Sequence, residues 1–278
     1  MQDPFITALN TQKAALSWFS ELATNLSNVY TPGYRARRVT FADFINGVQV
    51  QQGYRKADQG KSMPGRGPSN LFIEGDGYFM VRTKTDELRY TRLGDFVLNE
   101  DGTLVNDKGW KVQGYLLGEN GKVINTGGSN IGGNANNPNL AKGGPGQIAT
   151  TEINLWVDPS NGKYFGKYDE YKVQSDGTVV GVSDSGKTTT PLYRVALANF
   201  TNSSGLREVE EHMFVPSDMS GDPVAGTGEI RSGLLEASNV SLKENVSYLQ
   251  QAKLQLDVTA KLISTNKQLL EESLRLIQ

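Results

Sequence analysis

A heptad repeat of apolar residues near the C-terminus is the feature that most limits how this chain can fold. Leucine or isoleucine recurs at every seventh position beyond residue 234, and neither proline nor glycine follows Gly233. The pattern predicts one continuous amphipathic helix ~60 Å long, which exceeds the diameter of a small domain. The repeat comprises Leu235, Leu242, Leu249, Leu256, Ile263, Leu270 and Ile277.

The N-terminal end carries a shorter pattern of the same kind. Its apolar residues have the a/d spacing of a helix that packs on another helix, and Pro32 with Gly33 predicts a helix end near Asn28. A helix with one apolar stripe is marginal alone in water, so both ends need partners. The pattern alone favours an intramolecular two-helix hairpin, and packing between many copies is the alternative. The N-terminal seam residues are Leu9, Leu16, Phe19, Ala23 and Leu26.

Between the two helical ends, the sequence predicts antiparallel β-structure. Short alternating runs are joined by turns such as NEDG at 99–102 and NDKG at 106–109, which are typical of successive hairpins. Further strands are expected at 171–173, 178–182 and 192–199. We predict an α+β fold class, in which long N- and C-terminal helices form a coiled-coil-like inner domain and the centre forms a mainly antiparallel β domain.

The predicted organisation has four parts. The N-terminal helix and its turn occupy residues 1–34, and a connector rich in glycine and proline spans 35–70. The central β domain covers 71–233 and contains a Gly- and Asn-rich insertion at 125–149. The C-terminal helix occupies 234–278.

Composition argues against several classes of function. The formal net charge is -2, so the chain lacks the basic surplus that attracts phosphate backbones, and we expect no nucleic-acid partner. It contains no cysteine, which removes disulfides and thiolate sites. The N-terminus lacks the apolar core of a cleavable signal, and no run reaches the ~20 apolar residues of a membrane span, so we expect no membrane insertion.

Residues that could carry chemistry are sparse. His212 is the only histidine and has no second ligand or nucleophile at a telling spacing. The acidic residues Asp158, Asp169 and Glu170 miss the calcium-loop pattern. We therefore expect no catalytic residue, no metal site and no cofactor.

Three blocks of sequence resemble the bacterial flagellar basal-body rod and hook proteins. NLSNVYTPGY at 25–34 is similar to the family motif N-[LI]-A-N-x-x-T-x-G-[YF] and departs from it at Ser27. The segment 75–115 contains GDGYF and RYTRLGDFVLNEDGTLV, and LEASNV at 235–240 resembles the entry to the family's C-terminal helix. The matching motif residues include Asn25, Asn28, Thr31, Gly33, Tyr34, Gly75, Gly77, Ser238, Asn239 and Val240.

This resemblance implies a structural, non-catalytic subunit of the flagellar rod, which polymerises through its terminal helices into a tubular drive shaft for motility. It implies self-assembly into a helical polymer, contact with other rod and hook proteins and basal-body rings, and passage through the flagellar type III export apparatus. The expected location is the flagellar basal body, which is periplasmic in a cell with an outer membrane. The expected assembly interface comprises Leu9, Leu16, Phe19, Leu26, Leu242, Leu249, Leu256, Ile263, Leu270 and Ile277.

Three alternatives remain at this point. The first is the flagellar hook protein, and the rod subtype, proximal or distal, is also open. The second is a coiled-coil adhesin or scaffold whose helices close into a dimer. The third is an enzyme of the β domain acting on peptidoglycan; it would need paired carboxylates, and Asp76, Glu87 and Asp95 are better explained as turn and rim residues.

Overall fold

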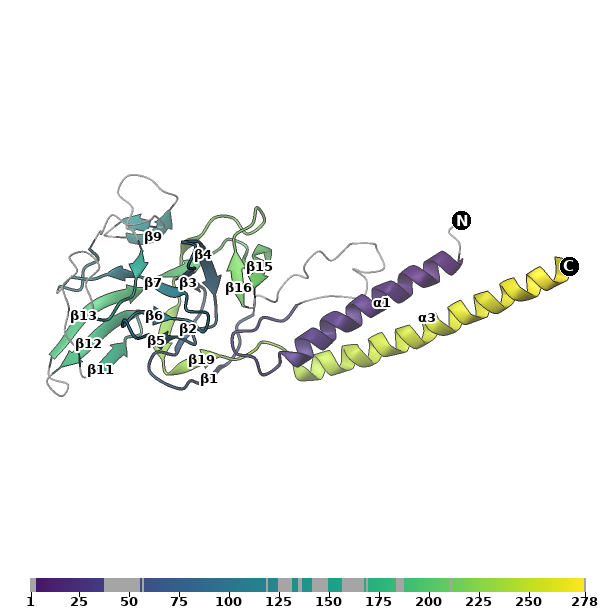
Figure 1. Ribbon diagram of the computed structural model, residues 1–278, viewed down its shortest axis with the longest axis horizontal. Coiled ribbons are helices and arrows are strands. Elements are labelled where there is room, and N and C mark those ends of the chain that lie inside the picture. Colours follow the sequence, from purple (N-terminus) through teal and green to yellow (C-terminus); the bar gives the residue numbers. More distant parts are fainter. Residues whose placement is uncertain are drawn as a thin grey trace. The chain divides into compact units, whose positions relative to one another are not determined.

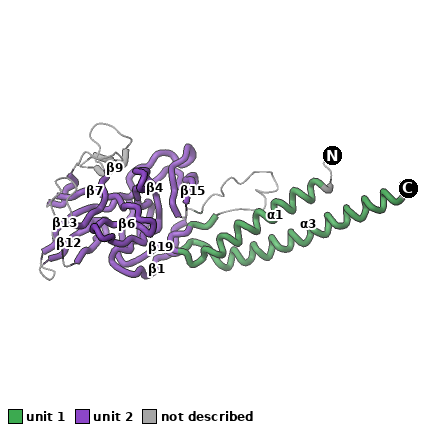
Figure 2. The backbone as a smooth tube through the Cα atoms, viewed as in Figure 1, with its two compact units in different colours: residues 1–31, 35–56, 238–278 green, residues 32–34, 57–237 purple. Residues whose placement is uncertain are grey.

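The computed structural model forms two compact units (Figures 1 and 2). Unit 1 combines residues 1–31, 35–56 and 238–278, and unit 2 combines 32–34 and 57–237. The structure describes residues 4–37, 56, 58–118, 120–124, 132–134, 137–141, 150–156, 168, 170–183, 188–210 and 212–277.

In chain order the elements are α1 (Pro4–Ser27), β1 (Ser62–Pro64), β2 (Leu71–Glu74), β3 (Tyr78–Arg82), β4 (Leu88–Thr91), β5 (Val97–Leu98), β6 (Leu104–Val105), β7 (Lys111–Leu116), β8 (Gly132–Asn134), β9 (Asn137–Ala141), β10 (Thr151–Glu152), β11 (Glu170–Val173), β12 (Thr178–Ser183), β13 (Thr188–Val195), β14 (Leu197–Asn199), the 3₁₀ turn η2 (Ser203–Gly205), β15 (Arg207–Glu210), β16 (Met213–Val215), β17 (Val224–Ala225), β18 (Glu229–Ser232), β19 (Leu234–Glu236) and α3 (Leu242–Ile277).

Unit 2 is built on one large antiparallel sheet. Its main path runs β11-β12-β13-β7-β3-β4-β16-β15. All five residues of the central strand β3 are buried. Alternate side chains of a strand point to opposite sides of the sheet, so β3 contributes to the packing on both faces. Phe79 and Val81 enter one apolar cluster, and Tyr78 and Met80 enter the other.

Two short ribbons bring distant segments of unit 2 together. In one, β18 pairs with β2 in antiparallel register, with Ile230 opposite Ile73. In the other, β19 pairs with β1, with Leu235 opposite Met63. The second ribbon therefore joins the strand that precedes the large sheet to the strand that follows it.

The strands β8 and β9 pair with each other inside the segment expected to be a Gly- and Asn-rich insertion at 125–149. The rest of that segment lies outside the described residues. Asp158 and Asp169 also lie outside them, whereas Glu170 begins β11.

Unit 1 contains the two α-helices of the described chain. They run antiparallel along each other (Figure 1). Their shared apolar contact is a small cluster of Trp18, Leu22 and Ala252, with Leu249 packed against it.

The predicted α+β class with a coiled-coil-like inner domain is wrong. The described residues are mainly β-structure with one helix near each end, although the expected central β domain is present. The heptad repeat predicts a helix that starts too early, because Leu235 lies in β19 and α3 begins only at Leu242. Leu262 and Leu269 remain 51% and 55% exposed, so apolar side chains do not interlock along the whole length of α3.

Candidate assembly interface

One face of α3 packs towards α1. Its buried and half-buried residues recur at intervals of four and three, the spacing of a helix that packs on another helix. Ala252 at the centre of this face is fully buried, and Leu256 and Ile263 are half-buried. The face comprises Asn245, Leu249, Ala252, Leu256, Thr259, Ile263 and Asn266.

The facing side of α1 is made mostly of small residues. Trp18 is its one large aromatic member, and its ring lies 6.2 Å from that of Tyr248 on α3. Alanine side chains let the helix backbones approach but bury little apolar area, so the helix pair gains modest stability from this contact. The buried residues of α1 are Ala8, Ala14, Ala15, Trp18, Leu22 and Asn25.

The apolar residues predicted from the N-terminal heptad do not occupy this buried side of α1. Leu9 and Leu16 are 36% and 53% exposed, and each directly follows a buried alanine, so it lies about 100° further round the helix. Phe19 is 39% exposed, and Leu26 is half-buried. The heptad therefore marks an apolar surface of α1 that α3 does not cover.

The packing face of α3 continues beyond the N-terminal end of α1. α1 has 24 residues and α3 has 36, which makes α3 longer by ~18 Å at the usual rise of a helix. Figure 1 shows the C-terminal turns of α3 extending past the start of α1. Leu270 and Leu274 continue the packing face there and are 58% and 65% exposed; the side chain of Ile277 lies outside the described residues.

A second apolar stripe runs along α3, away from the packing face. Its members are 45–65% exposed and fall on one side of the helix by their spacing: Leu254, Val258, Leu262 and Leu269. A third side of α3 is polar and carries Lys253, Asp257, Lys261, Gln268, Glu271 and Arg275. Leu242, which begins the helix, is 47% exposed. A helix with two apolar faces and one polar face can contact more than one neighbour.

Two asparagines of the family-like motifs hold the start of the connector in unit 1. Asn25 is 2% exposed; its Nδ2 donates to the Arg37 carbonyl, and its Oδ1 accepts from the Arg37 amide, both at 2.9 Å. Asn239 Oδ1 accepts from the Ala36 amide at 2.6 Å, and its Nδ2 donates to the Lys56 carbonyl at 3.3 Å. Each asparagine side chain supplies hydrogen bonds to backbone amide and carbonyl groups that a neighbouring β-strand would otherwise supply.

Other motif residues shape the two ends of unit 1's helices. Thr31 Oγ1 donates to Asn28 Oδ1 at 3.0 Å, after α1 has ended at Ser27. Ser238 Oγ accepts from the amide of Val240, which is 9% exposed. These bonds satisfy polar groups where each helix meets its connector.

The remaining motif residues lie in unit 2. Gly33 adopts a positive φ of 70°, its amide donates to the Glu236 carbonyl at 2.7 Å, and a Cβ there would lie 2.9 Å from that of Leu93. Tyr34 packs edge-on against His212, with 6.0 Å between ring centroids. His212 is therefore a packing partner of the motif.

Gly75 and Gly77 form the β2–β3 turn with positive φ angles of 95° and 144°, a conformation that disfavours other residues.

The described residues offer little for catalysis. They contain no group of three or more metal-ligating side chains. Asp95 accepts a hydrogen bond from Asn70, and Glu87 pairs with Arg89 at 2.6 Å.

Neither helix in the described part of the chain is long and apolar enough to cross a membrane.

Comparison with known proteins finds similar flagellar proteins. A family model described as "Flagellar hook protein FlgE/F/G D1 domain" matches residues 72–181. Flagellar basal-body rod protein FlgG of Buchnera aphidicola subsp. Acyrthosiphon pisum is 25% identical to this chain over 90% of each sequence. FlgG of Bacillus subtilis is 27% identical over 92% of this chain and 91% of that protein. These similarities relate the chain to flagellar rod and hook proteins.

Hook proteins of this family also match. Flagellar hook protein FlgE of Borreliella burgdorferi is 32% identical over 55% of this chain and 38% of that protein. A crystal structure of Helicobacter pylori hook protein FlgE2 gives a TM-score of 0.38 at 11% identity, covering 63% of this chain and all of that chain, a similarity too low to add to the assignment. The D1 match corresponds to β2 through the first part of β12, within unit 2.

Proposed function

We propose that this protein is a structural subunit of the bacterial flagellar rod, which polymerises through the helices of unit 1 into a tubular drive shaft. The observation that carries the proposal is the incomplete burial of α3. α1 covers one face over part of its length, and α3 exposes a second apolar stripe together with the extension at Leu270 and Leu274. Exposed apolar surface of this extent is typical of an interaction site.

Burial of these surfaces would offset much of the free-energy cost of association. Burying Leu254, Val258, Leu262, Leu269, Leu270 and Leu274 at about 1.5–3 kcal/mol each gives on the order of 10 kcal/mol. That figure is comparable with the free-energy cost of the translational and rotational freedom lost on binding.

Each α3 has two differently placed apolar surfaces, so contacts between copies can be heterologous. Heterologous contacts that do not close into a ring produce an open helical polymer.

The similarity to flagellar rod proteins supports the rest of the proposal. The protein acts by assembly and without a catalytic step, in the basal body, where its neighbours are other rod and hook proteins and the basal-body rings. It reaches that place through the flagellar type III export apparatus, and it is periplasmic where the cell has an outer membrane. The proposed assembly residues on α1 are Leu9, Leu16, Phe19 and Leu26.

The test introduces charge on the extension of α3. The double variant Leu270→Asp, Leu274→Asp should stay monomeric in sedimentation and electron microscopy, because burying two carboxylates in an apolar interface is costly. Its thermal unfolding should match that of the unmodified chain, since both side chains are exposed in the free protein. Gln268→Asp, two residues before Leu270 and on the polar side of the helix, should polymerise normally.

Two outcomes would contradict the proposal. Normal filaments from the double variant would remove the extension of α3 from the interface. A fixed stoichiometry of the unmodified chain at all concentrations would indicate the closed coiled-coil dimer of an adhesin or scaffold. The hook remains a second candidate because hook proteins are among the relatives, and the location of the tagged protein in isolated hook–basal bodies distinguishes the two structures.

A further inference from the structure

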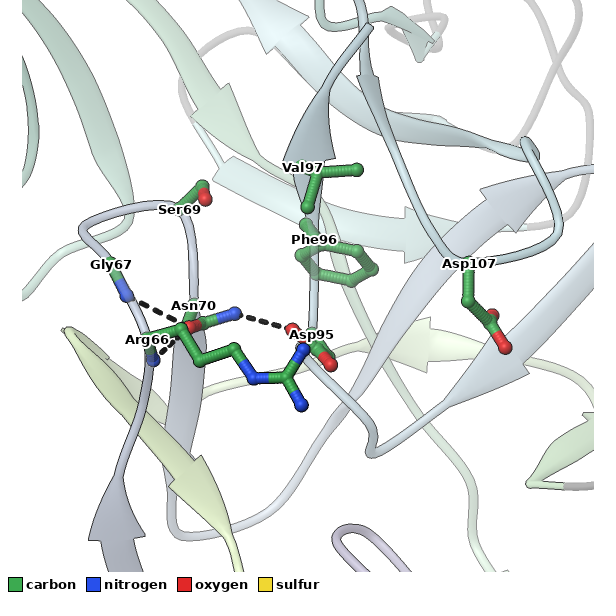
Figure 3. A pocket seen from close by; sticks show the side chains of 8 residues that line it. All are labelled: Arg66, Gly67, Ser69, Asn70, Asp95, Phe96, Val97 and Asp107. Carbon is green, nitrogen blue, oxygen red and sulfur yellow. Dashed lines mark hydrogen bonds between the residues drawn. The ribbon is translucent and has the colours of Figure 1, made fainter.

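A pocket of about 390 Å³ lies in unit 2 beside the short strand β5 (Figure 3). Its walls come from the turn before β2, the residues leading into β5, and the β6–β7 turn. The lining residues are Arg66, Gly67, Ser69, Asn70, Asp95, Phe96, Val97 and Asp107. The helices of unit 1 do not contribute to it, and Asp95, Phe96 and Val97 belong to the family-like block RYTRLGDFVLNEDGTLV.

The polar wall of the pocket is fixed by Asn70, which is 2% exposed. Its Oδ1 accepts from the amides of Arg66 and Gly67, at 2.5 and 3.0 Å. Its Nδ2 donates to Asp95 Oδ1 at 2.6 Å, which Figure 3 draws as a dashed line. This bond holds the Asp95 carboxylate in place at the wall of the pocket.

The pocket carries more negative than positive charge. Asp95 and Asp107 contribute two carboxylates against the single guanidinium of Arg66. Figure 3 shows Arg66 reaching towards Asp95, and Asp107 stands on the far side of Phe96. Within the described chain, neither carboxylate forms an ion pair at 4.0 Å or less. The charge of the pocket therefore favours a cationic occupant.

The other wall is apolar. Phe96 is fully buried behind the pocket, and Val97 at its rim is 52% exposed. A cavity with carboxylates on one side and apolar carbon on the other fits a lysine or arginine side chain, whose alkyl stem packs on apolar surface while its charged end remains polar.

No strand of the described residues pairs with the adjoining edge of β5. Val97 and Leu98 pair with Val105 and Leu104 of β6, and the Leu104 amide donates to Ile153 instead of to β5. Leu98 and Leu104 are thus a non-hydrogen-bonded pair, and the N–H and C=O of Leu98 point away from β6. Leu98 is 38% exposed, and an exposed apolar edge of this kind is a surface that proteins normally cover.

We propose that this pocket receives a lysine or arginine side chain from a second copy of the chain. The proposal rests on the proposed function, because a heterologous assembly brings different patches of identical subunits together. The chain itself displays the complementary pattern, a cation with an exposed apolar residue two positions away. Lys122 precedes Ile124, which is 43% exposed, and Arg207 precedes Val209, which is 39% exposed. In the described structure neither Lys122 nor Arg207 is engaged by an acidic side chain.

This contact would set register between copies. Apolar helix surfaces can slide past one another with little penalty, whereas a cation in a pocket with two carboxylates fits at one position. Unit 2 would thus add specificity to an assembly whose energy comes mainly from unit 1.

The decisive experiment identifies the occupant directly. Benzoylphenylalanine placed at Val97 is activated by light in assembled filaments, and the cross-linked peptides are mapped by mass spectrometry. We expect an intermolecular cross-link to the segment containing Lys122 or the segment containing Arg207. Cross-links confined to one copy, or intermolecular cross-links only to segments without an exposed lysine or arginine, would overturn the proposal.

Charge reversal gives an independent measure. Asp107→Lys should raise the critical concentration for assembly about tenfold, and Asp101→Lys, an exposed aspartate outside the pocket, should leave it unchanged. Equal critical concentrations for the two variants would also overturn the pocket contact. If the unmodified chain fails to polymerise, the proposed function itself fails; if it polymerises and the variants behave alike, only the pocket contact does.

Discussion

Arg92 and Glu236 form a buried ion pair in unit 2, with 3.5 Å between Arg92 Nη1 and Glu236 Oε2. Their side chains are 4% and 2% exposed. Glu236 Oε1 also accepts from the Gly60 amide at 3.0 Å, and Arg92 Nη2 donates to the Gly75 carbonyl at 2.7 Å. The pair therefore ties the ribbon of β1 and β19 to the turn between β2 and β3.

Removing one partner of this pair should destabilise unit 2 strongly. Glu236→Gln keeps an acceptor for Gly60 but removes the buried carboxylate charge that faces Arg92, which should cost about 3–5 kcal/mol. The control is Glu74→Gln, because Glu74 and Arg231 form a pair with side chains 51% and 52% exposed. That change should cost less than about 1 kcal/mol in urea unfolding. Equal losses of unfolding free energy for the two variants would show that the buried pair stabilises the protein no more than the exposed pair does.

A second prediction concerns the clamp made by Asn25. Asn25→Ala removes the side-chain bonds to the amide and carbonyl of Arg37, so it should cost about 1–3 kcal/mol and speed hydrogen exchange at the Arg37 amide. Asn10→Ala, an exposed asparagine on the same helix, should stay within about 0.5 kcal/mol of the unmodified chain. Unchanged exchange at Arg37 would contradict the clamp.

The strands were predictable because alternation and turn residues are local signals. The expected strands at 171–173 and 178–182 correspond to β11 and β12, and the expected run at 192–199 spans the end of β13 and β14. The turn glycines Gly102 and Gly109 have the positive φ angles that such turns demand, 74° and 73°.

The helices were only partly predictable because apolar periodicity defines a face but not its partner. Leu9 and Leu16 gave the stronger signal on α1, yet the side facing α3 is built from alanines, which have no distinctive pattern. Leu235 kept the heptad spacing by coincidence and belongs to a strand. The pocket beside β5 left no signal at all, since Asn70 and Asp95 are far apart in the sequence and meet only through the sheet.

A third prediction follows from the close approach at Gly60. A Cβ at this position would lie 1.8 Å from the Ala237 carbonyl oxygen, which belongs to backbone that cannot turn aside. Gly60→Ala should therefore cost about 1–3 kcal/mol or more by forcing β1 away from β19. Gly67→Ala is the matched control, because its Cβ would meet nothing within 4 Å. Similar unfolding midpoints for the two variants would contradict the packing of this ribbon.

The last prediction concerns alkaline pH. Burial raises the pKa of Tyr115 from about 10 to about 12, and burial likewise raises the pKa of Tyr90 against the opposing positive charge of Arg82. An unfolded chain releases these phenolic protons near pH 10, while the folded protein retains them, so stability should fall as pH rises from about 10 to about 12. Each buried tyrosine contributes up to about 1.4 kcal/mol per pH unit to that slope.

Tyr115→Phe removes the group that titrates, so in urea unfolding at stepwise pH its slope above pH 10 should be shallower than that of the unmodified chain. Tyr30→Phe, at a tyrosine that is 85% exposed, is the control for the substitution itself. The comparison uses slopes, so a constant loss of stability from the substitution itself cancels. If the slope of the Tyr115 variant equals that of the unmodified chain, retention of the Tyr115 proton in the folded state is not the source of the alkaline loss.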